Sequence, residues 1–177
     1  MGIIDQIGLF IEQDENRELK IYCDMDSVLT DWEKAFQLIG DERTKGLTTR
    51  EFEDKYGLEE TWKLINGAGE AFWSEMPWLP DGKKLWNYIK PHNPTILSSP
   101  AKSKVSKTGK HIWIDRELGK GTPRILKREK WEEADPESVL IDDYNKKIDD
   151  WVNKGDGIGI LHTSADKTIA ELKKLGL

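Results

Sequence analysis

The stretch Ile21–Trp32, IYCDMDSVLTDW, places two acidic residues directly after an apolar run. Its first three residues suit a buried strand, whereas Asp24 and Asp26 need water, a hydrogen-bond partner or a counter-charge. A strand that ends at a polar site meets both requirements. We therefore predict a strand over Leu19–Cys23 that delivers the two carboxylates to a functional loop.

The same design recurs further along the chain. The segment TILSS ends in Ser98 and Ser99, and the segment SVLIDD ends in Asp142 and Asp143. Strand patterns alternate with helical patterns, which is typical of a parallel sheet with helices on both faces. Ligands of such α/β sheets bind beyond the carboxyl ends of the strands. We therefore expect these polar residues to meet along one edge of the sheet.

Carboxylates that crowd together raise each other's pKa unless a cation lies among them. The sequence shows no His or Cys cluster, so a hard divalent ion with oxygen ligands is expected. Mg²⁺ fits this description and commonly binds alongside the phosphate of a substrate. Lys110 and Lys130 lie between the serine and the later aspartate segments, and with the serine hydroxyls they would complete a site for a dianionic phosphate.

Composition limits the class of protein. The 177 residues are 37% hydrophobic and 34% charged and include 8 Trp, which suits one domain, or one domain with a modest insertion. The net charge of −6 gives no general attraction to nucleic acid or to anionic membranes. We expect a small phosphorylated substrate, no nucleic-acid polymer and no membrane, while an oligomer stays possible.

Cellular location is predicted from the single cysteine and from hydropathy. Cys23 cannot form an intramolecular disulfide, which fits a reducing compartment. The first residues lack the basic and long apolar regions of a secretory signal, and no run approaches the roughly 20 apolar residues of a membrane helix. We expect a cytoplasmic protein.

Helical signals fill the middle of the chain. Asp31 is a candidate N-cap, and Thr48 with Glu51 forms a candidate capping box. Thr163 with Asp166 forms another before the last helical pattern. Ile3, Ile7 and Ile11 recur at helical spacing, so we expect an N-terminal helical extension over residues 1–18. A core over residues 19–32 and 80–177 would then enclose a helical insertion over residues 33–79.

Several ordered blocks together resemble a known superfamily. They are DMDSVLTDW, ILSSP, a Lys before HIWIDRELG, KREK and VLIDD, and they run from about Ile21 to Asp143. They resemble the haloacid dehalogenase-like phosphohydrolases and look most like the 5′(3′)-deoxyribonucleotidase family. The resemblance implies a Rossmann-like parallel sheet with a small helical cap, and a Mg²⁺-dependent phosphatase of nucleotide metabolism. The chain has Ser27 where the family usually has glycine.

The resemblance also implies roles for the acidic residues. Asp24 would attack phosphorus and become an aspartyl phosphate, and Asp26 would protonate the leaving oxygen and then activate water. Asp143 matches the family's metal ligand, and Asp142 would support it or coordinate through water. The expected metal residues are thus Asp24, Asp26, Asp143 and Asp142, with Asp26 acting through its backbone carbonyl.

The remaining predicted residues would bind the substrate. Ser98 matches the phosphate-binding hydroxyl of the family and Ser99 follows it, while Lys110 and Lys130 match its lysines. The resemblance implies that aromatic residues at the Trp32 position and in the cap, such as Trp73, stack on the base of a (deoxy)nucleoside monophosphate. Stacking of this kind contributes about 1–3 kcal/mol per base.

Other interpretations of the same residues stay open. Asp24 and Asp26 alone could form a strand-end turn, and the cap tryptophans could belong to a hydrophobic core. The protein could act on another small phosphate ester, with the same core and a different cap preference. It could also be a non-catalytic nucleotide-binding or assembly protein of this fold, although the presence of both aspartates argues against that.

Overall fold

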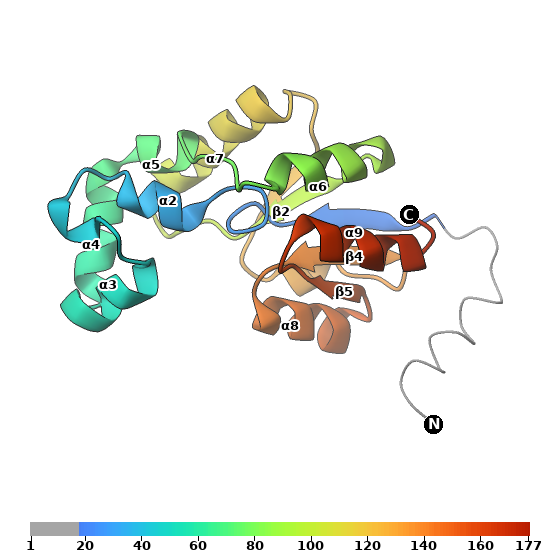
Figure 1. Ribbon diagram of the computed structural model, residues 1–177. Coiled ribbons are helices and arrows are strands. Elements are labelled where there is room, and N and C mark those ends of the chain that lie inside the picture. The colour runs from blue at the N-terminus through green and yellow to red at the C-terminus, as the bar shows by residue number, and fades with distance from the viewer. Residues whose placement is uncertain (1–17) are drawn as a thin grey trace.

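A computed structural model describes residues 18–177, so the predicted N-terminal extension lies almost wholly outside the described residues. The centre is a five-stranded parallel sheet with the order β3-β2-β1-β4-β5 (Figure 1). The predicted α/β fold with a parallel sheet is thereby confirmed. The strands are β1 (Lys20–Cys23), β2 (Thr95–Ser98), β3 (Arg124–Leu126), β4 (Ser138–Asp142) and β5 (Ile158–Leu161).

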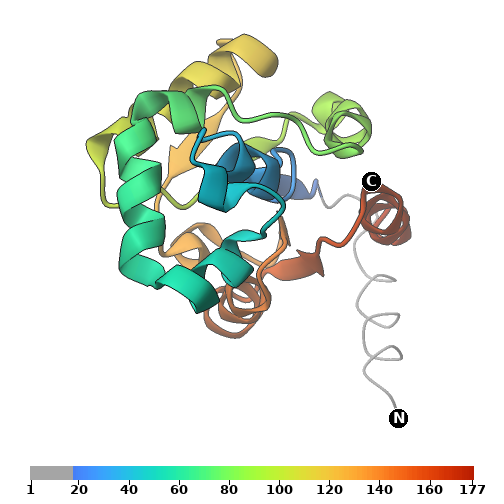
Figure 2. The same ribbon diagram turned by 60° about the vertical axis from the view of Figure 1, so that its left-hand side comes forward.

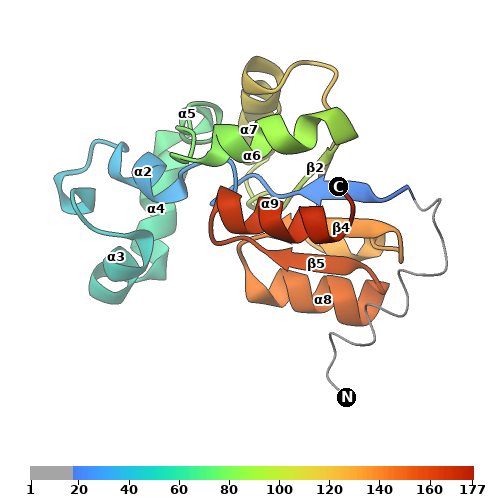
Figure 3. The same cartoon turned by 45° about the vertical axis from the view of Figure 1, so that its right-hand side comes forward.

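Helices connect the strands and cover both faces of the sheet. The α-helices are α2 (Trp32–Gln37), α3 (Thr49–Tyr56), α4 (Leu58–Ala68), α5 (Glu70–Ser74), α6 (Gly82–Ile89), α7 (Lys104–Glu117), α8 (Asn145–Gly155) and α9 (Ala165–Lys174). Short 3-10 helices are η1 (Glu42–Thr44), η2 (Lys90–His92) and η3 (Lys130–Glu133). Figure 3 shows α6 and α9 on one side of the sheet and α8 on the other.

Side chains on the strands supply two apolar layers, because successive residues of a strand point to opposite faces. On β1, Ile21 and Cys23 join the larger core, whereas Tyr22 packs in a smaller cluster around Trp151 of α8. The Tyr22 and Trp151 ring centroids are 5.2 Å apart. Burial on both faces explains why the central strands are apolar almost throughout.

The helix ends test the predicted caps. Asp31 accepts a hydrogen bond from the Lys34 N–H, and both bonds of the Thr48 and Glu51 capping box are present, so these predictions are confirmed. The capping box predicted for Thr163 and Asp166 is wrong, because Ser164 is the N-cap of α9. That helix begins one residue later, where the Asp81 carboxylate accepts the Ala165 N–H at 2.7 Å.

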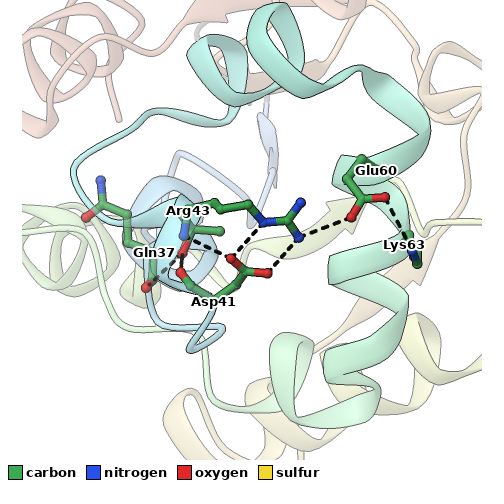
Figure 4. A network of polar contacts seen from close by, with 6 residues as sticks. Gln37, Asp41, Arg43, Glu60 and Lys63 are labelled. Atoms are coloured by element: carbon green, nitrogen blue, oxygen red, sulfur yellow. Dashed lines mark hydrogen bonds and ion pairs between the residues drawn. The ribbon is translucent and has the colours of Figure 1, made fainter.

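Helices α2 to α5 gather beyond the carboxyl end of β1 (Figures 1 and 2). Here the Arg43 guanidinium donates hydrogen bonds to both carboxylate oxygens of Asp41, at 2.9 and 2.7 Å, and to Glu60 Oε1 at 3.1 Å (Figure 4). The same guanidinium lies 5.7 Å from the ring centroid of Phe52 and 5.4 Å from that of Tyr56. One arginine therefore connects η1, α3 and α4, and α5 packs against α7.

Within residues 18–177, none of the helices combines the length and the apolar character needed to cross a membrane.

Candidate functional site

The loop after β1 places the first two aspartates. Asp24 continues the sheet, since its N–H donates to the Ile141 carbonyl at 2.9 Å. The chain then turns around the buried Met25, whose carbonyl accepts the N–H of Leu29 and of Thr30, both at 2.9 Å. Within this turn Ser27 has a φ of 59°, the left-handed region in which the family's glycine would be unstrained.

Two buried lysines neutralise the aspartates. The Lys130 ammonium lies 2.9 Å from Asp24 Oδ1 and 2.6 Å from Asp142 Oδ2. The Lys110 ammonium donates to Asp26 Oδ2 at 2.5 Å and to the Ser98 hydroxyl at 2.8 Å. Both lysine side chains are almost completely enclosed. Because an unpaired charge is costly to bury, each lysine requires its carboxylates and each carboxylate requires its lysine.

The two aspartates respond to these surroundings in opposite directions. Burial would raise the pKa of Asp24, but the charges of Lys130 and Lys110 outweigh it and hold the pKa below the usual value. Burial also raises the pKa of Asp26, and there the attraction of Lys110 does not compensate, because Asp24 adds a negative charge. Asp24 is therefore held as a carboxylate, and Asp26 keeps a proton more readily, a division seen in acid-base pairs of enzymes.

A cluster of three acids lies at the ends of β1 and β4. Asp24, Asp142 and Asp143 each offer a carboxylate oxygen, and these atoms all lie within 4.8 Å of one another. Burial and the charge of Asp24 raise the pKa of Asp142 to about 6, despite Lys130. Asp143 is exposed as a residue, yet desolvation of its carboxyl group and the charges of Asp24 and Asp142 raise its pKa to about 7.

These acids fit Mg²⁺. Their oxygens are the hard ligands that the ion prefers, and a cation bound among them would offset the burial and mutual repulsion that raise the pKa of Asp142 and Asp143. Asp24 Oδ1 has the Lys130 ammonium as its charge partner at 2.9 Å. The Asp26 carboxylate is outside this group and faces Lys110 instead.

A cavity of about 410 Å³ opens beside Asp26. Asp26 Oδ1 and the Ser99 hydroxyl oxygen are buried without a hydrogen-bond partner among the described residues, and both residues line this cavity. A volume of this size suits a small ligand. The lining residues are Asp26, Trp32, Trp62, Trp73, Ser99, Pro100, Ala101, Arg128, Glu129 and Lys147.

One wall of the cavity is aromatic. The Trp32 ring centroid lies 5.7 Å from that of Trp73, 6.5 Å from that of Trp62 and 5.1 Å from that of Phe72. The Lys110 ammonium is 5.4 Å from the Trp73 ring centroid, within the range of a cation–π contact. The aromatic wall is thus joined to the lysine that holds Asp26.

The structure brings all the predicted site residues to one region, but it distributes them between two layers. Lys110, Lys130, Ser98 and Asp142 are enclosed beneath the cavity, and Ser98 is engaged by Lys110. Four of the predicted site residues line the cavity, namely Asp26, Ser99, Trp32 and Trp73. Asp24 and Asp143 belong to the acidic cluster and are not among the lining residues.

Sequence reasoning missed part of the cavity wall. Arg128, Glu129 and Lys147 line it, and none of them was among the predicted site residues. The position of Arg128 and Glu129 beside Lys130 is a usable signal, since all three lie in the KREK segment. Lys147 lies in the first turn of α8, beside an equally basic Lys146, and no local pattern distinguishes the two.

The comparisons with known proteins concern structure. No protein-family model and no curated protein sequence matches the chain. Among solved structures, a hydrolase from Streptococcus pneumoniae TIGR4 is similar at a TM-score of 0.55 and 12% identity, over 90% of this chain and 98% of that one. A subfamily IA haloacid dehalogenase (HAD)-superfamily hydrolase from Geobacter sulfurreducens PCA is similar at 0.54 and 8% identity, over 84% and 89%.

A HAD-superfamily hydrolase from Ehrlichia chaffeensis is similar at a TM-score of 0.51 and 13% identity, over 89% of this chain and 97% of that one. These similarities extend over most of both chains in every case. They support the predicted superfamily fold. They give no support for the more specific prediction of the deoxyribonucleotidase family. The chain therefore has the α/β fold of HAD-superfamily hydrolases.

Proposed function

We propose that the protein is a phosphomonoesterase that hydrolyses (deoxy)nucleoside monophosphates through an aspartyl-phosphate intermediate. The observation that carries the proposal is the opposite tuning of Asp24 and Asp26, each paired with a different buried lysine, together with the small cavity that Asp26 lines. Pairs of acids whose pKa values are pushed apart supply a nucleophile and a proton donor at one site.

The proposed reaction has two steps. The Asp24 carboxylate forms a bond to phosphorus, and the bond from phosphorus to the ester oxygen breaks while Asp26 gives that oxygen its proton. Asp26, now a carboxylate, then takes a proton from a water molecule as that water attacks the phosphorus of the aspartyl phosphate. Inorganic phosphate leaves, and Asp24 is a carboxylate again.

The lysines and the metal residues make the attack of one anion on another feasible. Lys130 and Lys110 lie beside Asp24 and Asp26 and supply positive charge where phosphoryl oxygens would gather. Asp24, Asp142 and Asp143 would hold Mg²⁺, which when bound neutralises negative charge on a phosphoryl group. The Ser99 hydroxyl has no partner in the described residues and is available to the phosphate.

The substrate class is proposed from the cavity. Three tryptophans form one wall, and planar groups such as nucleobases stack on aromatic side chains. Residues 33–79 would act as a cap that covers the site and selects the leaving group. A cavity of about 410 Å³ suits a mononucleotide better than a polymer.

Phosphate release from a panel of nucleoside 5′- and 3′-monophosphates, with glycerol phosphate for comparison, tests the proposal. We expect release that requires Mg²⁺, stops with a chelator and is faster for nucleotides. Equal rates of phosphate release from nucleotides and from glycerol phosphate would support a phosphatase but contradict the proposed preference for nucleotides. Nucleotide binding without release, with Mg²⁺ present, would support the non-catalytic alternative instead.

A further inference from the structure

A short hydrogen-bond chain connects the aromatic wall to the N-terminus of α3. The Trp32 indole N–H donates to the Thr49 hydroxyl oxygen at 2.9 Å. That hydroxyl in turn donates to Glu33 Oε2 at 2.9 Å, and the Thr49 backbone N–H donates to the same oxygen at 2.5 Å. Because the hydroxyl hydrogen of Thr49 is used in the hydrogen bond to the Glu33 carboxylate, the Thr49 oxygen acts as the acceptor for the indole N–H.

Capping of α3 does not need the Thr49 hydroxyl. The side chain of Thr48 accepts the N–H of Glu51, and the Glu51 carboxylate accepts the N–H of Thr48, so a complete capping box already starts the helix. Thr49 is nevertheless buried at 8% exposure, and Glu33 and Trp32 both use its hydroxyl. The hydroxyl is therefore not part of the capping box, and it connects the Glu33 carboxylate to the Trp32 indole.

Trp32 occupies the centre of the aromatic wall. Among the ring contacts of residues 18–177, it is the one tryptophan of the cavity that contacts both of the others, Trp62 and Trp73. A rotation of its ring would break the hydrogen bond to Thr49 and also disturb both neighbours. The Thr49 hydroxyl, 17 residues away in the chain, therefore fixes the rotation of the central ring of the wall together with these ring contacts.

We propose that Thr49, itself oriented by Glu33, is a positioning residue that holds the Trp32 ring as a platform for a planar leaving group of the substrate. The inference rests on the proposed function in that the ligand is a phosphate ester whose planar leaving group stacks on the aromatic wall. It extends that function by assigning the choice between planar and aliphatic leaving groups to a residue that does not touch the substrate.

Binding to a protein that cannot turn over provides the test. In the Asp24→Asn background, equilibrium dialysis gives the Kd of p-nitrophenyl phosphate, a planar ester, and of glycerol phosphate, an aliphatic one. Thr49→Val removes the hydroxyl at nearly constant volume. We expect it to raise the Kd of the planar ester about fivefold, the equivalent of one net hydrogen bond, and that of the aliphatic ester less than about twofold.

Two further variants separate positioning from stability. Thr49→Ser keeps the hydroxyl and should restore the Kd of the planar ester. Thr48→Ala removes the capping box from the same helix end, and should lower the Tm while leaving that Kd unchanged. The Trp32 indole N–H resonance, identified by its loss in Trp32→Phe, should shift in Thr49→Val and return in Thr49→Ser.

The opposite results would overturn the inference. An equal rise for both esters in Thr49→Val, or the same rise in Thr48→Ala, would show that the hydroxyl serves stability alone. A shifted indole resonance with an unchanged Kd would show that the ring orientation does not matter for binding. If the planar ester responds as expected while no nucleoside monophosphate is hydrolysed by the unmodified protein, the proposed substrate fails and the positioning role stands.

Discussion

Two regions of the molecule differ in how their charges are paired. We call the carboxyl ends of β1 and β4, with the buried lysines beside them, the sheet edge, and we call α2 to α5 the helical group. At the sheet edge, Lys110 and Lys130 are almost completely enclosed, so each depends on an aspartate for its counter-charge. In the helical group, Arg43 and its acidic partners remain partly exposed to water (Figure 4). Exposed pairs contribute little to stability, whereas breaking a buried pair is costly.

This difference indicates which property of the protein, reaction chemistry or substrate choice, a substitution in each region should affect. The proposed reaction chemistry would depend on the sheet edge, whose geometry is fixed by the hydrogen-bonded parallel strands β1 and β4. Substrate choice would depend on the helical group, where aromatic contacts and single hydrogen bonds set the shape of the cavity. The predictions below test this division by changing one region at a time.

The largest effect is expected for Asp24→Asn. The amide has nearly the same volume as the carboxylate but cannot attack phosphorus, so phosphate release should fall at least about 1000-fold. Lys130 keeps Asp142 as a partner, so the fold should persist. Phosphate assays with circular dichroism on the same sample check both expectations. A folded variant that retains near-normal turnover would exclude Asp24 as the nucleophile.

Next comes Lys130→Met, which leaves Asp24 and Asp142 buried without their shared cation. We expect a loss of about 3–5 kcal/mol in the free energy of unfolding, measured by urea denaturation. The loss should be smaller at about pH 5 than at about pH 8, because protonated carboxyl groups no longer repel each other.

Lys127→Met is the matched control for that variant. Lys127 lies three residues earlier and pairs with Glu132 and Glu133 at 2.9 and 2.6 Å, but its side chain remains in contact with water. Its removal should cost no more than about 1 kcal/mol. Similar losses for the two variants would remove the distinction between the sheet edge and an ordinary surface.

Gly109→Ala tests how tightly α7 packs against α5 of the helical group. An added Cβ on α7 would lie 2.5 Å from Trp73 Cβ and 2.8 Å from the Glu70 carbonyl oxygen of α5. Since overpacking typically costs about 1–3 kcal/mol, the Tm should fall, and the displaced Trp73 should raise the KM for nucleotides. Gly67→Ala on α4, where nothing lies within 4 Å, should be neutral or stabilising. Equal Tm values would mean that α5 is not packed tightly on α7.

The acidic residues of the sheet edge can be predicted from the sequence because the patterns that mark them are local. An apolar run that ends in Asp24 or Asp142 marks the end of a strand, and parallel strands bring such ends together. The three strands that end in these polar residues lie where the sequence predicts them, within about a residue for β1. The placement of Lys110 and Lys130 came from the resemblance, since nothing local separates them from solvated lysines.

The cavity wall was less predictable because its contacts link distant segments. Thr49 meets Trp32 across 17 residues, and either could have packed elsewhere without any change in helix pattern. Lys147 faces the cavity while Lys146 pairs with Asp150 one turn along, a choice set by the way α8 crosses the sheet. Such choices are made by tertiary packing, which periodicity alone does not specify.

The smallest effect is expected for Ser27→Gly in the loop after β1. Ser27 has a φ of 59°, where a Cβ costs about 1–2 kcal/mol, and the residue lies in a turn held by its N–H donating to the Thr30 carbonyl at 2.8 Å. Glycine removes this strain but gains entropy in the unfolded chain, so the net gain should stay below about 1 kcal/mol in urea denaturation. Ser27→Ala keeps the Cβ and should bring no gain, which separates backbone strain from loss of the hydroxyl. A stabilised alanine variant would show that the hydroxyl, and not the left-handed backbone, is the unfavourable feature of this turn.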